Sequence, residues 1–377
     1  MAPASALINT AGAVAPTDCN TVVAPRKPGQ VPGAVAPDGA AVVDVLVDAE
    51  PPLPPWQAAS VTIATATSML RVLTGPEASQ PDPGWSPGAW PEESDRYAEL
   101  FMATLAERLG HSPDAKLLIV TADDLGLTHA SNVATYEAVR DGLASSASLM
   151  VPCPWARDAA GGYRGEDVGV HLTLNAELET YRWGPITNSP SLLDGDGGFP
   201  RTVEDAWDHA DLDEVRRECR AQIERAIVWG FDVSHLASHL GTLQPRPEFF
   251  DVYLELAIDF GLPLRLGDDT EERVAGFPFR RLAAEEGVVF PDHVVVCAPG
   301  ARRRVERVLF ELAPGVTELS LHPGLDTDEL RAACGDDWAG RVEDHATLCR
   351  DPSLRDLVVR AGATVIGWRD LRDLQRA

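Results

Sequence analysis

The stretch that most constrains this chain runs from Lys116 to Gly126 and reads KLLIVTADDLG. Its first half is a mostly apolar run, which is typical of a strand buried on both faces, as in a parallel sheet. The run ends in two adjacent carboxylates, Asp123 and Asp124. Like charges this close resist joint ionisation unless a cation lies beside them. The stretch therefore predicts a buried strand that ends either in a polar turn or in a site at the strand's carboxyl end.

Chain length, net charge and cysteine spacing limit the domain organisation, the partners and the kinds of site that this chain can have. The chain has 377 residues, enough for one large α/β domain and an appendage. Its 58 acidic residues outnumber 32 basic ones, which gives a formal net charge of −26. This charge argues against nucleic acid or an anionic membrane as a partner. The six cysteines are scattered without a C-x-x-C pair, so we expect neither a disulfide framework nor a thiolate zinc site.

The first 92 residues differ in composition from the rest. They hold 15 of the 30 prolines, in clusters such as the PPLPP run at residues 51–55. Sequence this rich in Pro and Ala sustains neither helices nor strand ladders, so we expect residues 1–92 to be largely disordered. The folded domain is predicted over residues 93–377. No apolar run is long enough to span a bilayer and no basic residue precedes Arg26, so we expect a soluble, cytoplasmic protein.

Apolar periodicity after residue 92 alternates between strand and helix patterns. The first strand is predicted from Lys116 to the two aspartates, and further strands at residues 147–151, 168–174, 233–238, 262–266, 294–297, 318–321 and 364–366. Helices are predicted at residues 94–109, 132–140, 212–229, 248–260 and 352–360. The alternation indicates βαβ units. Seven or eight such strands favour a (β/α) barrel over an open sheet.

Acidic and histidine side chains lie in or after four of these strands. They are Asp123 and Asp124, His171, His235 and His239, and His322. The carboxyl ends of the strands of a parallel α/β barrel meet on one face, so we expect these side chains to converge. A lone histidine in a strand is more often a hydrogen-bonded core residue, and His235 fits that description. Asp or His from four strands on one rim instead indicates a metal centre.

A carboxylate with two imidazoles binds a divalent ion and leaves positions open for water and substrate. Zinc, cobalt, manganese and magnesium are all compatible with such ligands. With Asp124 on the metal, Asp123 can accept a proton from metal-bound water, the nucleophile, and His322 can protonate the leaving group or stabilise the oxyanion. This is metal-assisted hydrolysis of an amide or ester. The remaining histidines are expected on the surface: His111, His129, His209, His293 and His345.

Four segments resemble the motifs of the YdjC-like (ChbG-type) carbohydrate deacetylases. TADDLGLTHASN resembles the A-D-D-F-G signature, and GVHLTL resembles the G-hydrophobic-H-x-x-L segment. SHLASHLGT resembles the H-x-D-S-H motif, and LSLHPG the C-terminal H-P-G. Order and spacing match over roughly residues 116–375. The resemblance implies an irregular (β/α) barrel related to polysaccharide deacetylases, and removal of the acetyl group of an N-acetylated sugar.

The resemblance also implies a role for each matching residue. By position, Asp124, His171 and His239 are the metal ligands, Asp123 is the base and His322 is the acid. The family's metal is usually described as magnesium, so the implied cofactor is a divalent cation, magnesium ahead of zinc, manganese or cobalt.

Several positions depart from the family pattern or suggest substrate contacts. Ala237 stands where the family commonly has Asp, and loss of that carboxylate would remove a partner of a metal-bound imidazole. Gly241 and Leu243 occupy positions that are histidines in the chito-oligosaccharide enzymes, so we expect a different substrate side of the pocket. Trp183, in a loop after a metal histidine, is a candidate for sugar stacking, with a buried loop residue as the alternative. Arg246 is a second candidate for substrate contact.

The sequence thus predicts a metal-dependent hydrolase that cleaves the acetamide of an amino sugar or glycoconjugate. Its partner would be a small-molecule or oligosaccharide substrate, and a homo-oligomer is left open. Three alternatives remain: a glycosidase that uses paired carboxylates, which gives the histidines no role; a non-catalytic sugar-binding or regulatory protein on the same fold; and an amidohydrolase that acts on a non-sugar amide.

Overall fold

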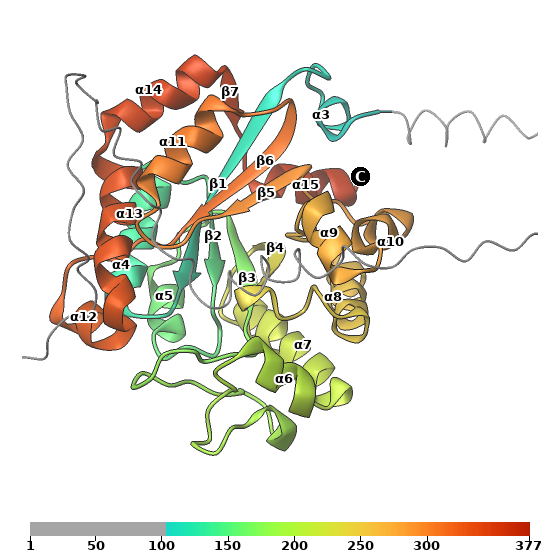
Figure 1. Ribbon diagram of the computed structural model, residues 1–377, viewed down its shortest axis with the longest axis vertical. Helices are drawn as coiled ribbons and strands as arrows, with labels where there is room; N and C mark the ends of the chain where they lie inside the picture. The colour runs from blue at the N-terminus through green and yellow to red at the C-terminus, as the bar shows by residue number, and fades with distance from the viewer. Residues whose placement is uncertain (1–102) are drawn as a thin grey trace, which may run out of the picture. The chain divides into compact units, whose positions relative to one another are not determined.

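The computed structural model describes residues 103–377, so the predicted disordered segment at residues 1–92 lies outside the described residues. Seven strands, all paired in parallel, form one curved sheet with helices packed around it (Figure 1). The strands are β1 (Lys116–Leu125), β2 (Ser146–Leu149), β3 (Val168–Leu172), β4 (Val233–Ser238), β5 (His293–Val296), β6 (Gly315–Leu321) and β7 (Ala363–Val365). The predicted α/β fold with an irregular barrel-like sheet is confirmed.

Strand β1 is the centre of this sheet, whose order is β4-β3-β2-β1-β6-β5 with β7 also on β1. One edge of β1 pairs with β6 from Lys116 to Ala122. The start of β1 also pairs with β7, and its end pairs with β2. Within the described residues no strand ladder joins β4 to β5, and this makes the barrel irregular.

The unbroken apolar run of β1 is explained by burial on both sides. Leu118 and Val120 belong to the larger hydrophobic core, whereas Leu117 and Ile119 pack in a smaller cluster with Trp368. All four side chains are fully buried. Because successive residues of a strand point to opposite faces, a strand between two cores has apolar residues at every position.

Helices connect and cover the strands. They are α3 (Leu105–Arg108), α4 (His129–Arg140), α5 (Ala156–Gly162), α6 (Val203–His209), α7 (Leu212–Val228), α8 (Pro247–Phe260), α9 (Asp269–Ala275), α10 (Phe279–Glu285), α11 (Arg302–Phe310), α12 (Asp328–Cys334), α13 (Trp338–Arg350), α14 (Pro352–Ala361) and α15 (Trp368–Gln375). Short 3₁₀ turns lie at η2 (Pro190–Leu192), η3 (His239–Gly241) and η4 (Gly335–Asp337). No helix among them is both long and apolar enough to cross a membrane.

Helix α7 shows how the local sequence sets these elements. The carboxylate of Asp211 accepts from the backbone N–H groups of Asp213 and Glu214, which caps the start of the helix. Val215 and Cys219, four residues apart, lie on its buried face. The predicted helix at residues 212–229 therefore matches the structure to within one residue.

Two predicted elements differ from the structure. The strand predicted at residues 262–266 is wrong, because only an isolated bridge joins Leu264 to Leu236. Pro263 has no backbone N–H to donate to a ladder, so regular pairing stops there. Of the helix predicted at residues 94–109, the described part forms one turn, α3, which Gly110 follows with a left-handed φ of 83°.

Candidate metal centre

The twin aspartates lie in a bulge at the end of β1. Ala122 pairs with Ala147 of β2 and Leu125 pairs with Leu149, so Asp123 and Asp124 together face the single residue Ser148. Asp124 has a φ of 65°, a left-handed conformation that is uncommon outside glycine. Such strain persists where the surrounding structure enforces it, frequently at functional sites. The bulge changes the direction in which the second carboxylate points.

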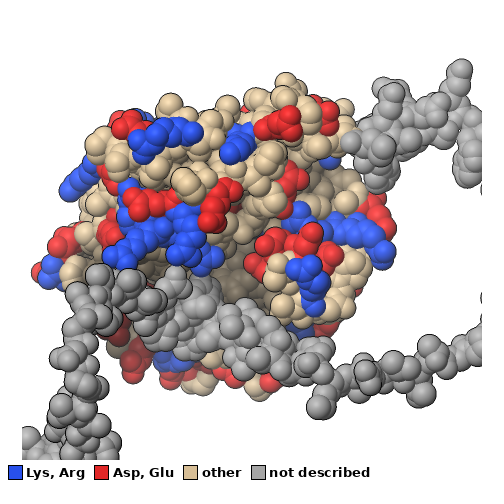
Figure 2. Space-filling view, turned by 45° about the horizontal axis from the view of Figure 1, so that its top comes forward, with Lys and Arg blue, Asp and Glu red and all other residues tan. Residues whose placement is uncertain are grey.

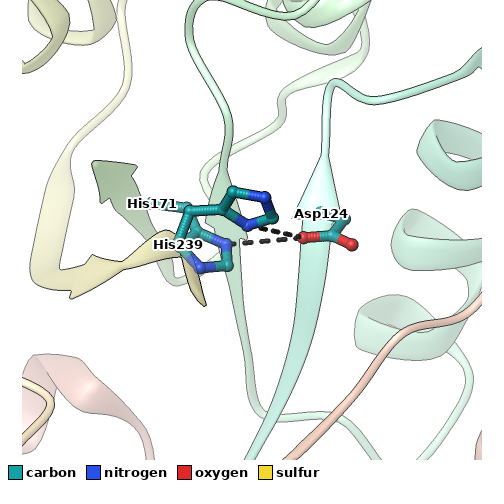
Figure 3. Close-up of side chains that lie close together, drawn as sticks. All are labelled: Asp124, His171 and His239. Atoms are coloured by element: carbon teal, nitrogen blue, oxygen red, sulfur yellow. Dashed lines mark ion pairs between the residues drawn. The ribbon is translucent and has the colours of Figure 1, made fainter. Parts of the chain in front are cut away.

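Asp124, His171 and His239 come together as the sequence predicted, from the ends of β1, β3 and β4 (Figure 3). Each offers one ligand atom, and these atoms lie within 4.8 Å of one another. Asp124 Oδ1 is 3.6 Å from His171 Nδ1 and 3.9 Å from His239 Nδ1. Ligand atoms about 2.1 Å from one cation are at most about 4.2 Å apart, so the two distances from Asp124 Oδ1 fit a shared ion. All three residues are buried.

The two carboxylate oxygens of Asp124 have different surroundings. Oδ2 accepts from Nη2 of Arg341 at 2.8 Å. Oδ1 is buried and has no hydrogen-bond partner within residues 103–377. Burial would raise the pKa of Asp124, but the Arg341 guanidinium and the neighbouring histidines hold that pKa well below its usual range. An ionised oxygen left without a donor and facing two imidazoles is what a divalent cation requires, so these residues fit the predicted metal.

His239 has a second acidic neighbour. Its Nε2 lies 3.0 Å from Oε2 of Glu177, which follows β3. Burial would lower the pKa of His239, but the Glu177 carboxylate outweighs burial and raises it. His239 therefore has a carboxylate partner although residue 237 of the same segment is an alanine.

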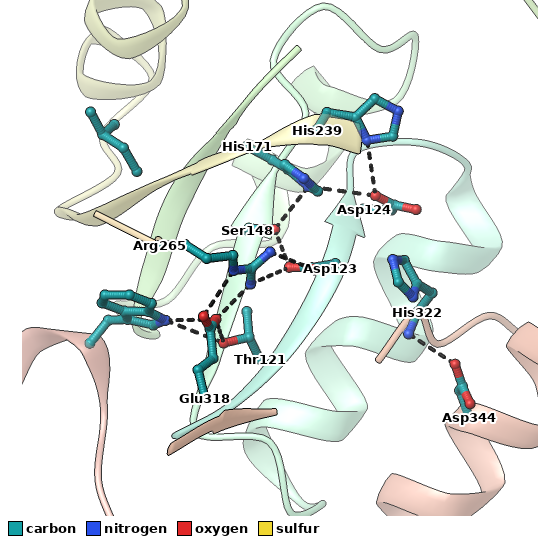
Figure 4. A network of polar contacts seen from close by, with 12 residues as sticks. Thr121, Asp123, Asp124, Ser148, His171, His239, Arg265, Glu318, His322 and Asp344 are labelled. Atoms are coloured by element: carbon teal, nitrogen blue, oxygen red, sulfur yellow. Dashed lines mark hydrogen bonds and ion pairs between the residues drawn. The ribbon is translucent and has the colours of Figure 1, made fainter. Parts of the chain in front are cut away.

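Asp123 is held by more donors than Asp124 (Figure 4). Its Oδ1 accepts from Ser148 Oγ at 2.6 Å and from Arg265 Nη2 at 3.0 Å, and its Oδ2 accepts from Arg265 Nη1 at 2.8 Å. Burial opposes ionisation of Asp123, but the Arg265 guanidinium and His171 reverse the effect and keep its pKa well below the usual range. Asp123 is thus a fixed negative charge beside the three converging residues.

Arg265 also joins this site to the core behind it. Its Nε and Nη2 donate to the fully buried carboxylate of Glu318 at 2.9 and 2.6 Å. Glu318 further accepts from Thr121 Oγ1 and from the indole N–H of Trp368. One guanidinium therefore neutralises two buried carboxylates, those of Asp123 and Glu318.

His171 is linked to Asp123 through Ser148. The Ser148 hydroxyl lies 3.1 Å from His171 Nδ1 and donates to Asp123. Burial lowers the pKa of His171 to about 4, although Asp123 opposes the shift. The imidazole is therefore neutral at physiological pH, the form that binds metal ions.

His322 lies at the end of β6, beside the same network (Figure 4). Its backbone N–H donates to Asp344 Oδ2 at 3.0 Å, and its side-chain Nδ1 is buried without a hydrogen-bond partner in the described part of the chain. The half-buried imidazole is among the groups that lower the pKa of both Asp123 and Asp124.

Three other residues singled out from the sequence, His235, Trp183 and Arg246, make no ion pair or hydrogen bond with the two aspartates in the described structure. His235 is fully buried and stacks on Trp368 at 4.4 Å between ring centroids, so it is a core residue. Trp183 is 4% exposed, donates its indole N–H to Asn175 O, and lies 6.5 Å from the His239 ring. Arg246 is half-exposed and packs over Trp207.

The prediction of His345 on the surface is wrong. This residue is 3% exposed and its Nε2 lies 2.8 Å from the Glu137 carboxylate. Helix α13, which carries it, was not predicted, so its buried face was missed. The same helix carries Arg341, which the sequence did not reveal as part of the site.

Three further site residues were not predicted: Ser148, Glu177 and Arg265. Ser148 lies in a short apolar strand and Glu177 in a polar loop, so neither stands out in the sequence. Arg265 is the clearest signal that was available, because a lone arginine within the apolar stretch at residues 262–266 requires a buried acidic partner.

Comparison with known proteins is in agreement with this geometry. The model of the family described as YdjC-like protein matches residues 117–359. The chain belongs to the YdjC-like family.

Relatives of this YdjC-like chain include two types of named deacetylase. A carbohydrate deacetylase of Thermus thermophilus is 37% identical over 278 residues, which cover 71% of this chain and 98% of that protein. A chitooligosaccharide deacetylase of Yersinia pestis is 32% identical over 160 residues, 40% of this chain and 59% of that protein.

A solved structure shares the fold of the YdjC-like chain. It is a protein of Enterococcus faecalis, provisionally named a cellobiose-phosphate cleavage protein, with a TM-score of 0.60 and 24% sequence identity. The match covers 68% of this chain and 99% of that one.

Proposed function

We propose that this YdjC-like protein is a metal-dependent carbohydrate deacetylase, which hydrolyses the acetamide of an N-acetylated sugar or glycoconjugate. The observation that carries the proposal is the buried Oδ1 of Asp124, which has no donor in the described residues and faces the Nδ1 atoms of two histidines. The names of the relatives, carbohydrate and chitooligosaccharide deacetylase, support the reaction and the substrate class.

Asp124, His171 and His239 would hold the cation. When bound, a divalent metal supplies a Lewis acid that polarises the acetamide carbonyl and activates a water molecule. The low pKa of the Asp124 carboxyl and the neutral His171 keep both residues ready to act as ligands at neutral pH. Magnesium remains the expected metal from the family resemblance.

Asp123 would accept the proton of the attacking water. Its Oδ2 accepts one hydrogen bond, from Arg265, and so retains a lone pair for that proton. Arg265 and Ser148 fix the direction of the carboxylate. Because the pKa of Asp123 is held low, a proton taken up there is readily passed on rather than kept.

His322 would donate a proton to the departing amine or stabilise the oxyanion. Its Nδ1 has no partner within residues 103–377, so the ring is not committed to another role in the described structure. Asp344 holds the backbone of His322 at 3.0 Å and so positions it at the end of β6.

Substrate contacts from Trp183 and Arg246 are part of the proposal. The Trp183 ring lies 6.5 Å from the ring of His239, which places it near the proposed metal centre, although the side chain is 4% exposed. On the face drawn in Figure 2, acidic and basic side chains are interspersed around a hollow whose visible atoms are mostly uncharged. A neutral sugar suits such a surface better than a highly charged polymer.

The competing glycosidase reading is less well supported by the contacts. Paired-carboxylate hydrolysis needs one acid with a raised pKa to act as proton donor. Both Asp123 and Asp124 have lowered pKa values, and each is paired with an arginine.

Acetate release from a panel of N-acetylated sugars tests the proposal. The wild-type protein should release acetate, and both a chelator and the substitution Asp123→Asn should reduce the rate by about 100-fold or more. Reducing sugar released without acetate would identify a glycosidase, and acetate release unaffected by chelator would exclude the metal. Sugar binding without turnover at any metal concentration would identify a non-catalytic protein, and turnover of acylated non-sugar amides alone would change the substrate class.

A further inference from the structure

The carboxylate of Glu177 determines which ring nitrogen of His239 faces Asp124 and His171. Glu177 Oε2 lies 3.0 Å from His239 Nε2. An ionised carboxylate can only accept, so Nε2 must carry the hydrogen. In a neutral imidazole the lone pair is then on Nδ1. This is the atom that lies 3.9 Å from the unpartnered Oδ1 of Asp124.

The loop that carries Glu177 is itself held in place by the two residues that precede the glutamate. The backbone N–H of Ala176 donates to Pro200 O at 2.9 Å, and the carbonyl of Ala176 accepts from Arg182. Asn175 donates to Thr202 O at 2.6 Å. Glu177 therefore starts from a fixed backbone, although its side chain is 29% exposed.

A hydroxyl joins this loop to the turn that carries His239. Thr242 Oγ1 contacts Asn175 Oδ1 and also donates to the backbone carbonyl of His239 at 3.1 Å. The imidazole and its carboxylate are thus held relative to each other by contacts independent of their own hydrogen bond. Groups pre-organised in this way are typical of residues that orient metal ligands.

We propose that Glu177 is the positioning residue of the metal centre: its carboxylate holds His239 as the Nε2–H tautomer and directs Nδ1 to the cation. The proposal rests on the metal centre of the proposed function. It also explains how Ala237, which offers no polar atom, is compatible with an oriented metal ligand at His239. Glu177 acts through His239 and is not itself assigned a ligand bond.

Titration of the metal-free full-length protein with Mn²⁺ tests this role, with calorimetry and the EPR signal of free Mn²⁺ as readouts. Mn²⁺ suits oxygen and nitrogen ligands and avoids competition from the cysteines. Glu177→Ala should raise the Kd for Mn²⁺ by about 10–100-fold. Glu177→Gln should raise it less, because an amide oxygen still accepts from Nε2–H without the charge. The matched control is Glu179→Gln, an exposed residue of the same loop, which should change the Kd by no more than about twofold.

The ring tautomer gives a second readout that needs no metal. Long-range ¹H–¹⁵N spectra of histidine-labelled protein, recorded at a pH above the pKa of His239 and with His239 assigned from a His239→Gln sample, should show the Nε2–H tautomer in the wild type. Glu177→Ala should shift this signal towards a mixture of tautomers. A residue needed only for folding would lower the melting temperature without this change.

Each result bears on one of the two proposals. Unchanged Mn²⁺ affinity in both Glu177 variants, or an Nδ1–H tautomer in the wild type, would overturn the role of Glu177 while leaving the metal centre intact. A wild-type protein that does not bind Mn²⁺ would overturn both proposals. Weakened Mn²⁺ binding in the variants without acetate release by the wild type would support Glu177 and reject the deacetylase reaction.

Discussion

The surroundings of Asp123 differ from those of Asp124, although the two residues are neighbours in β1. Both oxygens of Asp123 accept hydrogen bonds, from Ser148 and from two nitrogens of Arg265. Asp124 has one oxygen on Arg341 and the other without a donor in the described residues. Each acid has its own arginine, so a metal is not needed to keep the two charges ionised. The difference is one free oxygen, which makes Asp124 the residue able to bind a cation.

The largest expected effect comes from removal of either carboxylate charge. Asp124→Asn should abolish Mn²⁺ binding. It should also reduce the rate of acetate release by about 1,000-fold or more, which corresponds to a loss of several kcal/mol of transition-state stabilisation. Asp123→Asn should reduce the rate by about 100- to 10,000-fold but retain Mn²⁺ binding. Calorimetry with Mn²⁺ and an acetate assay separate the two effects. Equal loss of Mn²⁺ binding in both variants would contradict the difference drawn between the two aspartates.

Removal of the two arginines should affect stability to different degrees. Arg265→Met leaves the buried carboxylates of Asp123 and Glu318 unpaired and should lower the free energy of unfolding by about 3–5 kcal/mol. Arg341→Met leaves only the Asp124 carboxylate without its arginine, and a cation bound there can take the place of the guanidinium. Mn²⁺ at about 100 times its wild-type Kd stabilises the wild type by about 2.7 kcal/mol, and it should stabilise Arg341→Met by more than this.

Denaturant unfolding with and without Mn²⁺ measures both arginine variants. The same Mn²⁺ concentration should stabilise Arg265→Met no more than the wild type. Arg265→Lys retains a charge and provides a folded reference should the methionine variant not fold. Rescue of Arg265→Met by Mn²⁺ to the extent seen with Arg341→Met would show that the two arginines are equivalent.

Asp344 extends the comparison to a buried acid without an arginine bond. It accepts from the backbone N–H groups of Gly300 and His322, and burial raises its pKa to about 6. A raised pKa means that the folded protein binds a proton that the unfolded chain has released. This contribution to stability is complete below about pH 4 and is lost as the pH rises through about 6. The free energy of unfolding of the wild type relative to Asp344→Asn should therefore fall by about 3 kcal/mol over this range.

Urea denaturation at several pH values between 4 and 7 measures this difference. The asparagine variant serves as the reference because all other titrating groups are common to the two proteins. A difference that grows with rising pH would indicate that Asp344 is stabilised as an anion, like Asp123 and Asp124.

The smallest expected effect is at Arg246. This residue packs over Trp207 at the surface, and its ion pairs among the described residues are with Asp208 and Glu248. Arg246→Ala should raise KM a few-fold with kcat unchanged, as expected for a contact made equally in ground and transition states. The free energy of unfolding should change by no more than about 0.5 kcal/mol. Steady-state kinetics with the best substrate measures the effect, and a fall in kcat alone would place Arg246 closer to the chemistry.

The elements that were predicted correctly are those with a strong local pattern. β1 has an unbroken apolar run at residues 117–120 because cores lie on both sides of it, and α7 has both a capping aspartate and regular apolar spacing. Asp124, His171 and His239 could be found because strand ends of a parallel sheet meet on one face. Their convergence follows from topology rather than from detailed packing.

The arginines and Glu177 could not be predicted in the same way. Arg341 lies 217 residues from Asp124 in a helix with a mixed pattern, and no local feature connects the two. Glu177 is one of many acidic residues of this chain and differs from Glu179 only in what it contacts. Long-range ion pairs depend on how helices pack against the sheet, and apolar periodicity carries no such information.

The bulge at the end of β1 has a consequence for any change in this segment. In a regular strand two consecutive side chains point to opposite faces, so one of the aspartates would lie on the far side of the sheet. The extra residue opposite Ser148 and the left-handed turn at position 124 remove that alternation. Deleting one residue there would restore regular pairing and separate the proposed base from the proposed metal ligand. Asparagine and glycine tolerate this conformation. A β-branched residue at position 124 would strain the backbone as well as remove the carboxylate, so the two effects could not be separated.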